Sequence, residues 1–349
     1  GFLALCEDNL PTPAIADPGD YMRTVLYTGD GNSGRSITGV GFKPDFVWMK
    51  KRDTNTADHW LFDSIRGPLN LLESSTADPE LNRSTSLQSF DNDGFSMGAD
   101  SAYNTSGANY VAWCWKAGGA AVSNTDGSIT SQVSVNQDAG FSIVSYTGNA
   151  TDSTVGHGLN KTPGFIIVKK RNGGADWPVY HHSLATQEYL VLNSTSAKNT
   201  TTELFYQDPT SSVFYIGDAS NAINASGGTY IAYCWTEIEG FSKFGSFSGN
   251  SSTDGVFVYT GHRPAFVMIK RTDSTGNWVM HDNARNSTNP AKGYLLANSS
   301  GVEDAGSDIL DFLSNGFKIR NSWTDINASG GSYVFASFAE SPFQTANSK

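Results

Sequence analysis

The chain contains three copies of one succession of short motifs. Each copy has an aromatic-hydroxyl-glycine triplet, an apolar run from a proline to a lysine, a tryptophan, and an Asn-x-Ser-Gly turn before a tyrosine. The triplets are Tyr27-Thr28-Gly29, Tyr146-Thr147-Gly148 and Phe247-Ser248-Gly249, and the apolar runs are 44–50, 163–169 and 264–270. The tryptophans are Trp60, Trp177 and Trp278, the turns begin at Asn104, Asn224 and Asn327, and the tyrosines are Tyr110, Tyr230 and Tyr333.

The spacing of the copies holds from one motif to the next. The prolines that open the apolar runs are 119 and then 101 residues apart, and the tyrosines are 120 and then 103 residues apart. A repeat of about a hundred residues is too long for a solenoid or propeller unit and long enough for a core of its own. The sequence therefore predicts three domains in tandem.

Composition and patterning predict an all-β fold of three tandem antiparallel β-sandwich domains, similar to jelly rolls. The chain has 36 glycines, 12% aromatic residues and only 16% charged residues, which is typical of short strands joined by many turns. We expect a connector strand over 1–22, sandwiches over 23–119, 140–239 and 240–349, and a linker over 120–139. Within that linker, residues 129–135 alternate enough to add a strand.

Charge and hydropathy exclude two classes of partner. A net charge of −11 and a pI near 4.9 argue against nucleic acid, because phosphate binding depends on lysine and arginine. No apolar run approaches the roughly 18 residues of a membrane helix, so we predict no membrane insertion. The opening residues lack the basic start of a secretion signal, and we expect further sequence upstream of Gly1.

Neither the histidines nor the cysteines form a catalytic or metal-binding pattern. The histidines do not recur in step with the repeats, no zinc-ligand spacing is present, and Asp91-Asn92-Asp93-Gly94 is best interpreted as a turn. Cys114 and Cys234 recur at one position and are predicted to be buried thiols, whereas Cys6 is a candidate for pairing with another chain. We predict a non-enzyme with no catalytic residue, metal or cofactor.

Two recurring side chains have competing interpretations. Lys50, Lys169 and Lys270 end apolar runs, where we expect the stem to lie on the sheet and the amine to stay in water. The three repeat tryptophans are predicted to be buried, the alternative being exposed rings that stack on sugars.

Eleven Asn-x-Ser/Thr sequons occur in the chain. Asn104, Asn224 and Asn327 are candidate glycosylation sites because they recur in every copy. The alternative is that the repeated turn itself requires them, because asparagine and serine bond their own downstream backbone.

The first 22 residues are the strongest functional feature. They begin with an apolar run and continue through Pro11, Pro13 and Pro18, which favour an extended chain. Such a segment suits insertion into a sheet edge of a neighbouring subunit, giving a head-to-tail homopolymer. The predicted assembly residues are Phe2, Leu3, Leu5 and Cys6. The alternative is a segment that packs on its own first domain or has no fixed structure.

Several short sequence motifs resemble those of a domain of unknown function found in tail-fibre and other structural proteins of aquatic bacteriophages. They are Leu26-Tyr27-Thr28-Gly29, residues 41–48, Asp93-Gly94-Phe95, Tyr110-Val111-Ala112-Trp113 and residues 338–343. Residues 1–6 with Asn9-Leu10-Pro11 also look like the junction after an upstream lectin-like domain. The resemblance implies a structural role outside the cell or on a virion, with no catalytic residues.

These observations lead to a first hypothesis and an alternative. The first is a non-enzymatic subunit of an extracellular fibre or helical filament, whose partner is its own neighbouring copy. The alternative is an adhesin whose aromatic side chains bind cell-surface glycans. A glycan-cleaving enzyme would need two carboxylates about 5 to 10 Å apart, and a sequence gives no such distance.

Overall fold

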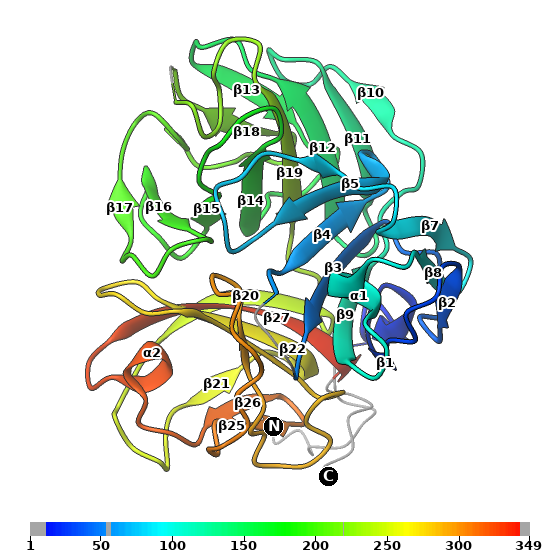
Figure 1. Ribbon diagram of the computed structural model, residues 1–349. Helices are drawn as coiled ribbons and strands as arrows, with labels where there is room; N and C mark the ends of the chain where they lie inside the picture. The colour runs from blue at the N-terminus through cyan, green and yellow to red at the C-terminus, as the bar shows by residue number, and fades with distance from the viewer. Residues whose placement is uncertain (1–11, 54–56, 219, 343–349) are drawn as a thin grey trace.

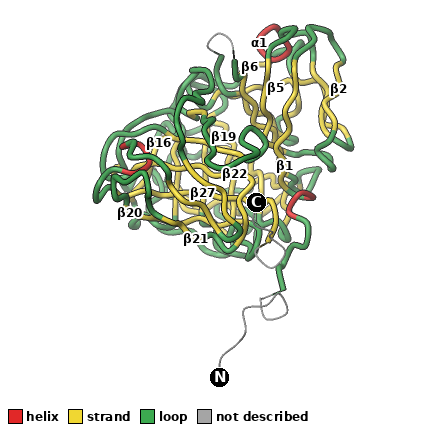
Figure 2. Tube along the Cα trace, turned by 90° about the horizontal axis from the view of Figure 1, so that it is seen from below, coloured by secondary structure: helices red, strands yellow, loops and turns green. Residues whose placement is uncertain are grey.

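The computed structural model describes residues 12–53, 57–218 and 220–342. Strands make up 44% of the chain and helices 3%, and the named strands pair antiparallel, which confirms the all-β prediction. No helix among the described residues is long and apolar enough to span a membrane. Strands fill the interior and loops lie around them (Figure 2).

Each repeat builds a main sheet in which equivalent strands follow one another in the same order, and the second sheet has two additional strands, β10 (Val122–Asn124) and β11 (Ser131–Asn136), at one edge. In the first repeat the order is β1 (Met22–Thr28), β9 (Asn109–Trp115), β3 (Phe46–Lys51), β4 (Trp60–Asp63), β5 (Gly67–Glu73) and β6 (Leu81–Asn82). In the second it is β10, β11, β12 (Phe141–Thr147), β19 (Thr229–Trp235), β14 (Phe165–Lys170), β15 (Pro178–His181), β16 (Glu188–Val191) and β17 (Asn199–Thr200). In the third it is β20 (Ser242–Ser248), β27 (Ser332–Pro342), β22 (His262–Arg271), β23 (Trp278–Asp282) and β24 (Leu295–Leu296).

A smaller sheet accompanies each main sheet. These sheets contain β2 (Arg35–Thr38), β8 (Gly94–Met97) and β7 (Leu87–Asp91); β13 (Ser153–Gly156) and β18 (Val213–Ile216); and β21 (Phe257–Tyr259), β26 (Gly316–Ile319) and β25 (Leu310–Leu313). Short helical turns lie at η2 (Pro18–Asp20), α1 (Ser101–Asn104) and α2 (Thr324–Asn327).

The central strands β3, β14 and β22 of the main sheets are buried on both faces, and the two faces belong to different cores. In β3, Val47 and Met49 lie in a core made by the first repeat alone, whereas Phe46 and Trp48 lie in a central core. The other repeats divide their strands in the same way, because successive side chains of a strand point to opposite faces. Strands that are apolar on both faces therefore connect the local cores to the central one.

The central core joins all three repeats. Trp115 and Trp235 end β9 and β19, Phe338 holds the equivalent position within β27, and their ring centroids are 5.6 to 6.3 Å apart. Figure 1 shows the blue sheet of the first repeat beside the green sheet of the second and the yellow-to-red sheet of the third. The predicted row of self-contained sandwich domains is not confirmed, because much of each sheet's apolar surface is buried against the other two repeats.

Residues 120–139 are not a spacer. They include β10 and β11, which extend the main sheet of the second repeat, with β11 paired to β12. An isolated parallel bridge between Ile129 and Val155 also ties this segment to the smaller sheet. The predicted linker is therefore part of the second repeat, as the alternation over residues 129–135 indicated.

The described part of the predicted connector packs on its own chain. Ile15 lies in the central core, and the ring of Tyr21 meets that of Phe241 edge-on at 6.1 Å. Pro13 lies so close to Gly240 that a Cβ there would be 3.3 Å from Pro13 Cβ. Residues 12–22 thus pack on their own chain, but against the third repeat and the central core rather than on the first repeat alone, while Phe2, Leu3, Leu5 and Cys6 lie outside the described residues.

Candidate functional site

The repeats meet at three boundaries that use the same backbone contacts. In each, the amide of a residue shortly before β4, β15 or β23 donates to a carbonyl of the neighbouring repeat. These bonds run from Ala175 to Ala77, from Gly276 to Thr195, and from Ala57 to Ser300, at 2.8, 2.9 and 3.2 Å. The second repeat thus donates to the first, the third to the second and the first to the third. The boundaries form a closed head-to-tail ring within one chain.

The three recurring lysines cross these boundaries. Lys169 Nζ donates to Ala77 O at 2.9 Å, Lys270 Nζ to Thr195 O at 3.2 Å, and Lys50 Nζ to Ser300 O at 3.2 Å. All three side chains are buried, and burial lowers the pKa of each amine to about 8. The prediction that their amines stay in water is wrong, because neighbouring carbonyls replace the solvent.

A ring N–H makes a further bond at two of the boundaries. Trp177 Nε1 donates to Glu73 O at 3.0 Å, and Trp278 Nε1 donates to Val191 O at 2.9 Å. Sheet register places His59, not Trp60, at the equivalent position of the first repeat, next to the carbonyl of Leu296. Burial and, second, the charge of Lys50 lower the pKa of His59 well below its usual value. All three repeat tryptophans are buried, as predicted.

Two boundaries contain a fully buried ion pair. Asp63 and Arg66 lie 2.5 Å apart, and so do Asp282 and Arg285. The carboxylates also accept bonds from the adjoining repeat, Asp63 from the Tyr233 hydroxyl at 2.7 Å and Asp282 from Trp113 Nε1 at 3.0 Å. A buried charge is tolerated when its remaining bonding positions are filled in this way.

The third boundary uses a different pair at the same place. His181 stands where the other repeats have the buried aspartate, and Ala336 stands where they have Trp113 or Tyr233. With no donor available from alanine, His181 Nε2 bonds instead to Phe335 O at 3.1 Å. This boundary therefore differs from the other two in both residues, the aspartate and its donor, and it keeps a hydrogen bond between repeats without a buried charge.

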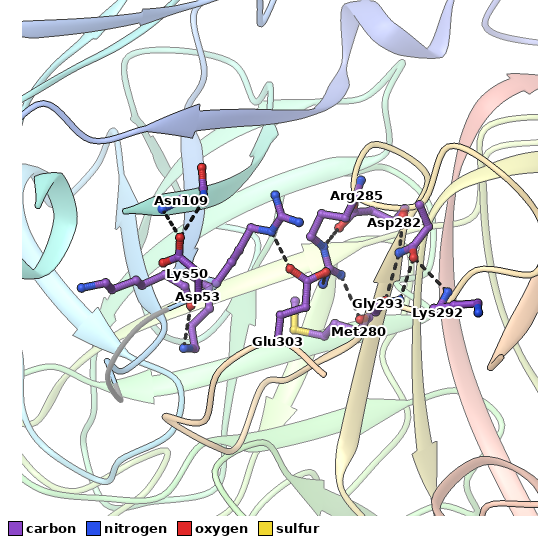
Figure 3. A network of polar contacts seen from close by, with 12 residues as sticks. Lys50, Asp53, Asn109, Met280, Asp282, Arg285, Lys292, Gly293 and Glu303 are labelled. Carbon is purple, nitrogen blue, oxygen red and sulfur yellow. Dashed lines mark hydrogen bonds and ion pairs between the residues drawn. The ribbon is translucent and has the colours of Figure 1, made fainter. Parts of the chain in front are cut away.

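An outer layer of charges covers the two ion-paired boundaries. Glu303 lies between Arg285 of its own repeat, at 3.4 Å, and Arg52 of the first repeat, at 2.5 Å (Figure 3). Glu80 is held in the same way between Arg66, at 3.3 Å, and Arg171 of the second repeat, at 2.9 Å. Each glutamate therefore joins two repeats.

Two clefts open beside the boundary between the first and third repeats. One, of about 560 Å³, is lined by residues of β1 and β2, including Leu26, Ser36 and Thr38, and by Arg52 and Asn109. The other, of about 350 Å³, lies across Arg52 and Asn109 and also contains Asp53 and Glu303. Asp53 accepts two bonds from Asn109, so both carboxylates of this cleft are bound by protein groups (Figure 3).

Comparison with known families gives one match. The model of a domain of unknown function, DUF7483, matches residues 17–342. The chain belongs to the DUF7483 family. No curated protein and no solved structure gives a significant match. The family match covers most of the chain but contains no link to phage tail fibres, so that part of the resemblance stays a prediction.

Burial keeps several histidines and both described cysteines of this DUF7483 chain uncharged at neutral pH. Burial lowers the pKa of His181, His262 and His281 to about 3 and that of His157 to about 4. Burial raises the pKa of the Cys114 and Cys234 thiols, as expected for inert cysteines. Within the described residues, no group of three histidine, cysteine or acidic side chains is placed to hold a metal ion.

The three candidate glycosylation sites are buried. Asn104, Asn224 and Asn327 have no exposed side-chain surface, and each Nδ2 donates to backbone carbonyls of its own repeat. Each Oδ1 accepts the amide that follows the repeat triplet, at Asp30, Asn149 and Asn250. A glycan on Nδ2 would break these bonds, so the geometry of the DUF7483 domain favours the alternative, a structural turn.

The buried ion pairs had a sequence signal that our reading of the motifs missed. An aspartate is followed three residues later by an arginine in copies one and three, Asp63 with Arg66 and Asp282 with Arg285. Copy two has His181 and Leu184 at these places. Alignment of the copies by strand register, rather than by the tryptophans, exposes this pattern in the DUF7483 sequence.

Proposed function

We propose that the chain is a non-enzymatic structural subunit of an extracellular fibre or helical filament, joined head to tail through residues 1–11. The observation that carries this proposal is the ring of equivalent boundaries around Trp115, Trp235 and Phe338. Three sheets that share one core form a block resistant to bending, which suits a load-bearing subunit. Lys50, Lys169 and Lys270, whose pKa values burial lowers, donate to carbonyls of neighbouring repeats.

Residues 1–11 supply the proposed connection. Their apolar run, Phe2 to Cys6, precedes a chain that is anchored in the central core at Ile15. A strand anchored in this way transmits force directly into the body of its own subunit. The neighbour that receives it contributes backbone hydrogen bonds and apolar contacts.

Electron microscopy of purified protein tests this function. The full chain and a variant that lacks residues 1–11 are compared by negative stain across a range of concentrations, with circular dichroism as the control for folding. We expect filaments from the full chain and single particles from the variant. Single particles from the full chain at high concentration would contradict the proposal.

An adhesin is the second candidate, and one observation favours it. Phe257 and Tyr259 of β21 are 45% and 59% exposed, whereas the equivalent outward residues of β2 are Ser36 and Thr38. Neighbouring exposed rings on a strand can stack on sugars. A glycan array tests this alternative: binding should be lost in Phe257→Ala and Tyr259→Ala and kept in the control Val122→Ala.

A further inference from the structure

The outer edge of β1 has backbone groups that face away from its only paired neighbour. The backbone hydrogen bonds that Tyr21 and Gly29 make show that the odd-numbered residues of this stretch direct their N–H and C=O groups toward β9. In an antiparallel pair the alternate residues point the other way, so the N–H and C=O groups of Thr24 and Leu26 face the open side. Among the described residues, no strand pairs with that side of β1.

The second repeat shows which element fits this edge. There β11 pairs with β12, the equivalent of β1, with Gln132 opposite Ser145 and Ser134 opposite Ile143. Counting back from the repeat triplet, Leu26 corresponds to Ser145 and Thr24 to Ile143. An added antiparallel strand therefore has an internal precedent at these two residues.

The chain that precedes β1 does not take this position. The residues at the corresponding distance before β1 are 12–17, which contain Pro13 and are followed by Pro18. This stretch instead places Ile15 in the central core and Pro13 against Gly240. Within residues 12–53 and 57–119, no strand takes the place on β1 that β11 takes on β12.

The surface beside this edge is open and partly apolar. The cleft of about 560 Å³ lies between β1 and β2, and Leu26, which lines it, is 42% exposed. Thr24 Oγ1 is buried and has no hydrogen-bond partner within the described part of the chain. Unpaired strand edges next to exposed apolar side chains are sites for strand addition.

We propose that the edge of β1 receives the apolar segment Phe2 to Cys6 of a second copy, in the place that β11 takes on β12. This inference rests on the proposed function and names the acceptor within it. Residues 2–6 offer apolar side chains to both faces of an added strand, and Leu26 is the neighbouring apolar contact. β20 is also an edge strand, but its residue equivalent to Leu26 is Ser246, so it offers no apolar contact there.

Proline substitution tests the acceptor edge with a matched control. The N–H of Leu26 makes no bond to β9, so Leu26→Pro removes the outward donor and the leucine contact without breaking a β1–β9 hydrogen bond, and both losses oppose strand addition. Ser246→Pro makes the same change on β20. We expect Leu26→Pro to abolish filaments and Ser246→Pro to leave them unchanged, with circular dichroism confirming that both variants fold. Filaments from Leu26→Pro would overturn the proposal and leave the proposed function standing.

Disulfide trapping gives a second measurement that identifies the occupant. Cysteines are placed singly at Thr24, Leu26 and, as control, Ser246, and the native Cys6 is the partner, because Cys114 and Cys234 are buried. A disulfide forms only when the Cα atoms come within about 7 Å. We expect oxidised ladders of linked copies from Thr24→Cys or Leu26→Cys, lost when Cys6→Ser is added.

The other outcomes of the trapping experiment each overturn the proposal. A bond to Cys6 within one copy would show that the segment covers its own edge. Ladders from Ser246→Cys alone would move the acceptor to the third repeat. Filaments without a link to Thr24→Cys or Leu26→Cys would place the segment elsewhere, and a wild-type chain without filaments would remove the proposed function as well.

Discussion

The hydroxyl of Tyr233 donates to Asp63 Oδ2 at 2.7 Å, across the boundary between the second and first repeats. Both side chains are buried, and the same carboxylate holds Arg66 at 2.5 Å. Because the charge has no access to water, its stability depends on these partners. One bond from a neighbouring repeat thus helps to hold a charge that would otherwise destabilise the fold.

Removal of this hydroxyl should weaken the whole chain. We expect Tyr233→Phe to lower the free energy of unfolding by about 1 to 3 kcal/mol, because a charged acceptor loses one buried partner. Asp63→Asn should cost about 3 to 5 kcal/mol, because the Arg66 charge remains buried. Urea denaturation measures both, and Tyr259→Phe, at an exposed site, is the control. Equal effects of Tyr233→Phe and Tyr259→Phe would contradict this view of the boundary.

The buried histidines should make the fold sensitive to acid. Burial lowers the pKa of His181, His262 and His281 to about 3, whereas an exposed histidine has a pKa near 6.5. As the pH falls, the unfolded chain binds protons at these histidines before the folded chain does. The contribution of the neutral histidines to the free energy of unfolding is therefore present above pH 6.5 and is lost as the pH falls toward 3. At pH 4 each histidine would cost about 3 kcal/mol.

Acid unfolding should therefore occur between about pH 6 and pH 4, and circular dichroism across this range measures its midpoint. The variant His181→Gln should unfold at lower pH than the wild-type chain, because one titrating group is gone. An unchanged midpoint in a variant that is as stable as wild type at pH 7 would argue against a neutral His181.

The boundary lysines should likewise make stability rise with pH, in this case in mild alkali. With a pKa of about 8 when folded and about 10.5 when unfolded, Lys169 loses its proton first in the native state. The unfolded state then binds more protons, so the contribution of Lys169 to stability rises from pH 8 to 10, by about 2 kcal/mol. The difference in unfolding free energy between wild type and Lys169→Met should change by that amount, and a constant difference would contradict the shifted pKa.

Glycan attachment should avoid the repeated turn. Expression in a host that glycosylates Asn-x-Ser/Thr sequons should leave Asn104, Asn224 and Asn327 unmodified in folded protein, because their amides are buried donors. Asn160 and Asn199 are exposed sequons and serve as internal controls in peptide mass spectrometry. Modification of the three buried sites in a folded sample would show that the turn opens.

Local patterns predicted the strands better than the arrangement of the repeats. The apolar run of β3 predicts a strand covered on both faces, because Phe46 and Val47 point to opposite sides. It does not say what covers each face, and the structure places the second face against other repeats. Burial by a distant part of the chain leaves no periodic mark in a single sequence.

The same limit applies to the boundary residues. A lysine at a strand end looks solvated, and the acceptors of Lys50 include the carbonyl of Ser300, 250 residues away. Such a partner is a backbone group, so no side-chain motif identifies it. The aspartate-arginine pairs were detectable, in contrast, because both members lie three residues apart in one repeat.

The most direct test of the common core is amide hydrogen exchange on Phe338→Ala. Truncation of a buried phenylalanine costs about 3 to 5 kcal/mol, and Phe338 touches Trp115 and Trp235 of the other repeats. Three repeats around one core should open together, so protection in β9, β19 and β27 should fall by the same free energy. A loss of protection confined to residues 240–342 would contradict the account and show three independent domains.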